Sequence, residues 1–438
     1  MKKSLLWLKR ELDAWVSEGI IMSDQAEAIR KRYPDETPGL PWGTIIFSGL
    51  GGVILGLGVI LLFAYNWDKI PRFWKLALIF GVLGIVHTIA VNLYTRSERF
   101  KALGEALGLL GTMIFGAGIF LVAQIYHIEE HFPNAFIIWA IGALAMAWAM
   151  PSIAQGILAA VLIAVWCGSE SFAYNDAMHT GPLIIVALLG SLAYVKRSRI
   201  LLAVLIPAFL ASLLFVQAGL YCESGILFGT ALNVAVLLVA TGILARRYGG
   251  FPESSPIFLF FGWVVSFIVL YVLTFPEAAK ALLVFNHDKS SALSLAYWIG
   301  ADVLCLGAWA FIAYTSMLRK KNLGVTSVDY LLPLTVILGV FYMLFKGNME
   351  GWAMAGPFNL VFLALVISML ARGCRLAMLK PTVIGSILLL VYAFSRYFDL
   401  FHSLLERGLV FIVVGALIFG QGILYSRAKS RKTEEEKQ

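Results

Sequence analysis

Charged side chains are scarce in this chain of 438 residues. Asp, Glu, Lys and Arg together make up 14% of the sequence, whereas soluble domains carry roughly 25%. Hydrophobic residues make up 60%, and the few polar residues cannot cover a globular core of that size. The shortage of charge therefore excludes a soluble globular protein and indicates a chain that crosses a membrane many times.

Cysteine is also rare, and the four cysteines are scattered without a C-x-x-C pair. This pattern argues against both a zinc knuckle and a disulfide framework. The sequence contains no G-x-S-x-G motif and no glycine-rich phosphate loop after a strand. The net charge of +8 is explained by basic loops on the cytoplasmic side. We therefore predict no cofactor and no nucleic-acid partner.

Long hydrophobic runs begin at Gly43 and follow one another to residue 426. A membrane helix needs about 20 apolar residues, so we predict an all-α polytopic bundle of about fourteen transmembrane helices. If the runs 134–150 and 152–168 form one re-entrant hairpin, the count falls to about twelve. The predicted spans are 43–65, 74–94, 104–126, 134–150, 152–168, 182–195, 199–219, 225–245, 256–274, 292–315, 328–345, 351–371, 380–397 and 408–426.

Basic residues test this order of spans, because cytoplasmic loops carry an excess of Lys and Arg. With the N-terminus inside, 26 of the 34 Lys and Arg residues fall in cytoplasmic segments. We therefore predict that both termini are cytoplasmic, and the lipid bilayer is the first expected partner.

The ends of the chain are the polar parts. Residues 1–42 place Leu8, Leu12 and Trp15 at helical spacing, and Gly19 ends that helix. The segment is predicted to form a cytoplasmic amphipathic helical hairpin. It can pack on the cytoplasmic loops, lie on the membrane, or bind another membrane or cytoplasmic protein through residues 1–40. The end of the chain, 427–438, is predicted to be a charged, disordered tail.

Two polar clusters lie at predicted outer ends of spans. Asn66, Asp68 and Arg72 are crowded into the first outer loop, and Arg396 and Asp399 repeat this mixture of charges near the end of the chain. Such residues cap helices and anchor them at the interface. The functional interpretation is an ion-paired rim around a cavity.

The turn after the third predicted span holds Gln124, Tyr126, His127, Glu130 and His131. Its letters match H-x-x-E-H, in which two imidazoles four residues apart on a helix hold Zn²⁺ and a carboxylate acts as base. A proline follows two residues later, where a helix ends. The alternative is a polar turn in which Gln124 and Tyr126 form hydrogen bonds with neighbouring helices.

Asp302 lies near the middle of its predicted span. A carboxyl group is costly at that depth and needs a partner, a proton or water. We interpret Asp302 either as a protonatable site that couples transport or as an acid bonded to a neighbouring helix. Gly104 and Gly108, four residues apart, predict close packing of one helix face.

Four segments of the first 150 residues or so combine polar and apolar residues in a distinctive pattern. They are W-x-x-x-G-I-I (Trp15 to Ile21), A-x-N-W-D-x-I-P (Ala64 to Pro71), G-A-G-I-x-L-x-x-Q-I-Y-H-I (Gly116 to Ile128) and W-A-x-G-A-L (Trp139 to Leu144). In these segments the chain resembles a bacterial family of predicted membrane proteins, domain of unknown function 2157. The resemblance implies a bacterial cytoplasmic (inner) membrane protein without an established activity, with a family-like core at 43–150. The recurrent pattern of the family includes Tyr126 to Ile128 but not Glu130 or His131, which counts against zinc.

These features support three functions. The first is binding or transport of a small or lipid-like molecule in a cavity that opens outward between the first four spans. Transport predicts a polar cavity that reaches Asp302. The second is a membrane-embedded, metal-dependent hydrolase, which predicts that His127, His131 and a third ligand surround one metal ion. The third is a scaffold or sensor that acts through the N-terminal hairpin.

Overall fold

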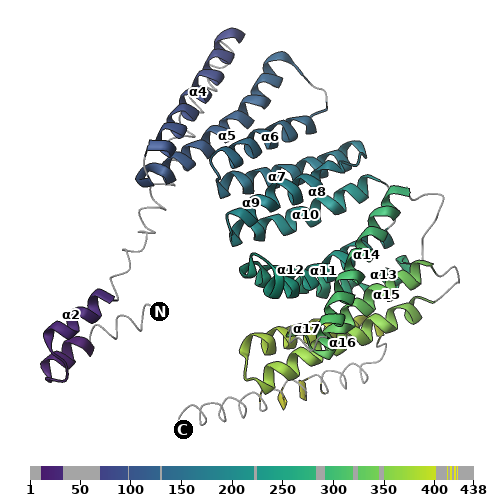
Figure 1. Ribbon diagram of the computed structural model, residues 1–438. Coiled ribbons are helices and arrows are strands. Elements are labelled where there is room, and N and C mark those ends of the chain that lie inside the picture. Colours follow the sequence, from purple (N-terminus) through teal and green to yellow (C-terminus); the bar gives the residue numbers. More distant parts are fainter. Residues whose placement is uncertain are drawn as a thin grey trace. The chain divides into compact units, whose positions relative to one another are not determined.

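The computed structural model describes the chain in several ranges, and every regular element within them is a helix (Figure 1). The chain divides into two units, 1–78 and 79–438, and each is described by itself. The described residues are 11–32, 70–96, 98–128, 131–220, 224–282, 292–318, 324–344 and 350–400, with single residues at 412, 415, 416, 419, 420 and 422.

The first unit contains two short helices joined by a tight turn. Residues 11–17 are helical, and Gly19 has a φ of 72°, a left-handed conformation that ends the helix. The second helix is α2 (Ser23–Arg32). Among the described residues of this unit, the buried apolar side chains are Leu12 on the first helix and Ala26 on α2. The first hydrophobic run, 43–65, lies outside the described residues.

The second unit is built from consecutive apolar helices. Its elements, with α4 spanning the boundary between the units, are α4 (Arg72–Arg96), α5 (Glu98–Tyr126), α6 (Pro133–Ala149), α7 (Ile153–Ser169), the π-helix η2 (Glu170–Tyr174), α8 (Thr180–Ile184), the π-helix η3 (Ile185–Leu189), α9 (Gly190–Val195), α10 (Arg199–Gly219), α11 (Ser224–Tyr248), η4 (Pro252–Ser254), α12 (Ser255–Leu273), α13 (Pro276–Ala281), α14 (Ala292–Ala313), η5 (Tyr314–Leu318), η6 (Ser327–Tyr330), α15 (Leu331–Leu344), α16 (Gly351–Arg375) and α17 (Leu379–Leu400).

Within the described ranges, nine helices are long and apolar enough to cross a membrane. Three shorter apolar helices, Pro133–Ala149, Thr180–Val195 and Val328–Tyr342, coincide with three further predicted spans. The predicted all-α membrane architecture is thus confirmed. The first and last predicted spans, 43–65 and 408–426, fall wholly or mostly outside the described residues.

The run from 134 to 168 folds as two helices. α6 and α7 each have 17 residues and meet at a tight turn around Met150 and Ser152. In Figure 1, α6 lies between α5 and α7, and the three helices pack as successive neighbours. The helical stretch Ile153–Tyr174 has 22 residues, about 33 Å at 1.5 Å per residue. This length matches the roughly 30 Å hydrocarbon core of a bilayer.

Glycines set the spacing around α5. A Cβ atom on Gly104 would lie 2.6 Å from the backbone nitrogen of Tyr94 in α4, whereas one on Gly108 would lie 3.2 Å from the sulfur of Met150 after α6. The predicted close packing is present, but the two glycines approach different helices. Gly104 therefore allows α4 to approach α5 closely, and Gly108 allows the chain at the end of α6 to do so.

Candidate functional site

A cavity of about 550 Å³ lies among α4, α5 and α6. Its walls are almost entirely apolar and include Phe80, Phe115 and Ile138. Two of its lining residues, His131 and Asn134, are polar and come from the turn before α6 and from its first residues. The cavity therefore has a long apolar body and one polar end.

A second cavity, of about 430 Å³, continues from the first. The two share Phe80, Leu83 and Phe115 as lining residues, and the second also reaches His87 and Thr112. We call the two together the α4–α6 groove. On α6 its lining extends from Asn134 to Met146, which corresponds to about 18 Å at 1.5 Å per residue.

Small residues make room for the groove and large ones fix its walls. Gly118 and Gly142 are lining residues, and a Cβ atom on Gly142 would come within 2.6 Å of the Phe115 ring. Trp139 lies directly over Gly116 and donates a hydrogen bond of 2.8 Å from Nε1 to the carbonyl oxygen of Thr112. This contact fixes α6 against α5 beside the groove.

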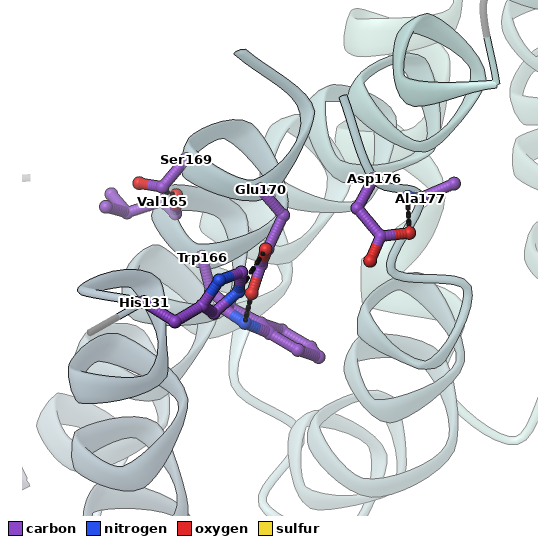
Figure 2. Close-up of polar contacts among 7 residues, drawn as sticks. All are labelled: His131, Val165, Trp166, Ser169, Glu170, Asp176 and Ala177. Atoms are coloured by element: carbon purple, nitrogen blue, oxygen red, sulfur yellow. Dashed lines mark hydrogen bonds and ion pairs between the residues drawn. The ribbon is translucent and has the colours of Figure 1, made fainter. Parts of the chain in front are cut away.

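A buried carboxylate in η2, directly after α7, binds His131 at the polar end of the groove. Glu170 is 1% exposed, and its Oε2 lies 2.7 Å from Nε2 of His131 (Figure 2). Its Oε1 accepts a hydrogen bond of 3.0 Å from Nε1 of Trp166, one helical turn earlier. Both carboxylate oxygens are therefore engaged, and Glu170 orients the imidazole without lining either cavity itself.

Local backbone geometry brings these groups together. His131 has a φ of 26°, and Pro133 follows as the first residue of α6. On the other side α7 passes into the π-helix η2, which carries both Glu170 and Tyr174. The Tyr174 ring lies 4.1 Å from the His131 ring, measured between centroids. π-helical turns are frequent at functional sites, and this one presents two side chains to the same histidine.

The other residues singled out in this turn do not line either cavity. Gln124, Tyr126 and His127 are exposed near the end of α5, and His127 has a φ of 55°. In the described part of the chain, neither Gln124 nor Tyr126 forms a side-chain hydrogen bond to a neighbouring helix. Glu130 lies outside the described residues, and within these no group of three His, Cys, Asp or Glu side chains is placed to hold a metal ion.

Asp302 lies in a different polar contact. It is 6% exposed on α14, and its Oδ1 accepts a hydrogen bond of 2.5 Å from Nδ2 of Asn233 on α11. Neither cavity of the groove is lined by Asp302. The transport hypothesis predicted a polar cavity that reaches this residue, whereas the structure shows Asp302 in a helix–helix contact.

Arg396 forms a third polar cluster. It is 3% exposed on α17, donates from Nη2 to the hydroxyl of Thr274, and lies 4.1 Å from the centroid of the Phe275 ring. Asn359 of α16 also joins this cluster, because it donates a hydrogen bond of 2.9 Å to the Thr274 carbonyl. Arg72 is exposed at the start of α4, and the structure does not describe Asn66, Asp68 or the side chain of Asp399.

Sequence reasoning missed Glu170, Asn134 and Trp166. A signal for Glu170 was present, because it is a single acid at the end of an apolar run, four residues after a tryptophan. On a helix this spacing places an acceptor beside the indole N–H. Nothing in the sequence indicated that His131, 39 residues earlier, would be the second partner.

The first third of the chain is similar to a known family. Residues 13–156 match a family model described as predicted membrane protein (DUF2157), which confirms the resemblance found from the sequence. No curated protein and no solved structure matches the chain. The matched segment includes all residues that line the groove, but ends before Glu170.

Proposed function

We propose that this chain, whose residues 13–156 match the family of predicted membrane proteins, binds a long-chain, lipid-like molecule in the α4–α6 groove. The observation that carries the proposal is the form of the groove, which has an apolar body and a polar end at His131 and Asn134. Its first cavity, about 550 Å³, falls within the roughly 300–1,000 Å³ of small-molecule sites.

The walls define the class of ligand. An ion or a sugar needs polar partners over most of its surface, since an unpaired buried polar group is costly. The first cavity offers such partners only at His131 and Asn134. In the second, His87 and Thr112 are the polar lining residues, and each bonds a carbonyl of its own helix. An apolar tail with a single polar group therefore matches the groove. The proposal concerns binding, the step that transport and other lipid-handling functions share.

An occluding substitution tests this proposal. Ala135 lines the groove, whereas Ala106 is exposed on α5 and lines neither cavity. We expect the wild type and Ala106→Phe, purified in mild detergent, to retain a lipid-like molecule in about equimolar amount, measured by extraction and mass spectrometry. Ala135→Phe should lose most of it, because the phenyl ring occupies the space of the tail.

Two results would contradict binding in the groove. One is a wild-type protein that retains no more of any lipid than an unrelated membrane protein purified in the same detergent. The other is equal retention by Ala135→Phe and Ala106→Phe. Elution of both variants at the wild-type volume in size-exclusion chromatography shows that a loss of lipid does not reflect unfolding. Ala123→Phe, at another lining position, provides a second occluding variant.

We further infer that the chain has about fourteen spans in a bacterial inner membrane, with both termini in the cytoplasm. The distribution of 26 of 34 basic residues supports this topology. In this topology the turn before α6 and the end of α7 lie on the same, outer side, which agrees with the contact between His131 and Glu170.

Reporter fusions test the topology. Alkaline phosphatase needs disulfides, which form outside the cytoplasm, whereas green fluorescent protein fluoresces inside it. At the C-terminus we expect a fluorescent protein fusion to fluoresce and a phosphatase fusion to be inactive. Phosphatase inserted between residues 129 and 130 should be active. An active C-terminal phosphatase would show that the number of spans is odd or that the orientation is reversed.

A further inference from the structure

The polar end of the groove restricts the charge of the head group that can bind there. Among the described residues, no lysine or arginine lines either cavity. An anionic head group would therefore lose its hydration without gaining an opposite charge. A cationic head group finds no carboxylate either, since both oxygens of Glu170 are bonded to Trp166 and His131. The groove consequently matches an uncharged polar group.

Hydrogen bonding restricts the head group further. A carboxylate only accepts hydrogen bonds, so in its contact with Glu170 the Nε2 atom of His131 is the donor. In the neutral imidazole the other nitrogen, Nδ1, is then an acceptor. Within the described residues Nδ1 has no hydrogen-bond partner. The Asn134 amide, also at this end of the groove, supplies both N–H donors and an oxygen acceptor.

A hydroxyl group satisfies both residues with a single oxygen atom. Its O–H can donate to Nδ1 of His131, and its oxygen can accept from the amide N–H of Asn134. We infer that the α4–α6 groove binds a long-chain alcohol, with its hydroxyl at His131 and Asn134. This inference rests on the proposed function and specifies its ligand. Long-chain prenols and diacylglycerols share this chemistry.

Glu170 acts here as a positioning residue. It does not line the groove, but it fixes the ring of His131 through Nε2 and so determines which nitrogen accepts. Trp166 in turn fixes Glu170 by its own hydrogen bond. The arrangement requires no movement of charge when the ligand enters, because the carboxylate and its two donors are already in place.

A series of ligands with one tail and different head groups tests the inference. The probes are palmityl alcohol, palmityl methyl ether, palmitic acid and palmitylamine. Each is added to the full chain in nanodiscs at a known mole fraction, and each competes with a photoreactive palmityl probe. We expect the alcohol to bind about tenfold more tightly than the methyl ether, which corresponds to 1.4 kcal/mol, because the ether cannot donate to Nδ1. The acid and the amine should bind more weakly than the alcohol.

Variants assign this preference to residues. In His131→Phe the tail should still bind, but the alcohol and the ether should bind equally, since the acceptor is gone. His131→Leu, which also removes the acceptor, serves if the phenylalanine variant does not fold. In Glu170→Gln the ratio of alcohol to ether affinity should fall, because the amide no longer fixes which imidazole nitrogen carries the proton. If Glu170 had a merely structural role, its replacement would weaken the binding of all four probes equally and leave the ratio of alcohol to ether affinity unchanged.

The outcomes separate this inference from the proposed function. If no palmityl compound competes, or if Ala135→Phe is labelled as strongly as the wild type, groove binding itself is wrong. If the tail binds but the acid or the amine equals the alcohol, only the head-group inference is overturned. The same holds if His131→Phe keeps the wild-type preference. If the preference for the alcohol is found, a comparison of a diacylglycerol and a polyprenol as competitors distinguishes the two sources of the alcohol.

Discussion

Gly116→Ala is expected to lower the midpoint of thermal unfolding strongly. The added Cβ would lie 2.1 Å from Cε2 and 2.2 Å from Cδ2 of Trp139, far inside contact distance. The indole cannot turn aside freely, because its Nε1 is bonded to the Thr112 carbonyl of α5. Overpacking of this kind costs typically about 1–3 kcal/mol. Unfolding of the purified protein, followed by intrinsic fluorescence in mild detergent, measures the effect.

A second glycine provides the control. Gly81 is on α4, and a Cβ atom added there meets nothing within 4 Å. Gly81→Ala should therefore leave the midpoint unchanged or raise it slightly, since alanine is the better helix former. Combining Gly116→Ala with Trp139→Leu should cost less than the sum of the two single changes, because the clash disappears with the ring. Equal midpoints for Gly116→Ala and Gly81→Ala would contradict the α5–α6 contact.

Asn233→Leu is expected to be the most destabilising change in the contact between α11 and α14. The substitution removes the donor of the 2.5 Å hydrogen bond and leaves the carboxyl group of Asp302 almost fully buried without it. A buried polar group that loses its partner costs about 1–3 kcal/mol. Asp302→Asn keeps an acceptor oxygen at the same place and should remain close to the wild type.

The double replacement gives the sharper result. When both partners become apolar, no polar group is left unsatisfied, and the cost can be nearly zero. We therefore expect Asn233→Leu/Asp302→Leu to unfold at a higher temperature than Asn233→Leu alone. The single change Asp302→Leu completes the comparison. If the effects of Asn233→Leu and Asp302→Leu simply added in the double variant, the pair would not interact, and Asp302 would return to the candidates for a coupling site.

The positions of the helices along the sequence were largely predictable, because the thickness of the membrane sets the length of the apolar run that each helix needs. A run of about 20 apolar residues has to satisfy its backbone hydrogen bonds internally, and only a helix does so within one segment. The described runs accordingly coincide with helices. The short helix α13 and the π-helical turns at η2 and η3 were not predicted, because they depend on local packing and have no distinct pattern of apolar residues.

The partners of the polar residues were not predictable for a related reason. His131 and Glu170 are 39 residues apart, and Asn233 and Asp302 are 69 apart. Each pairing depends on which helices become neighbours and on how each is rotated. Between apolar helices in lipid, small residues such as Gly116 and the fit of rings such as Trp139 determine which helices become neighbours. Both residues can be read from the sequence, but the contact between them cannot.

The groove is lined by three helices that are consecutive in the chain, from Ile79 to Met146. Because a chain emerges from the ribosome N-terminus first, every lining residue has been synthesised before α10 begins at Arg199. Glu170, which supplies the hydrogen bond that orients His131, lies between the last lining residue, Met146, and Arg199, so it too is synthesised before α10. All residues of the proposed site have therefore been synthesised while more than half of the protein has still to be translated, so the later helices are not needed to supply any of its side chains.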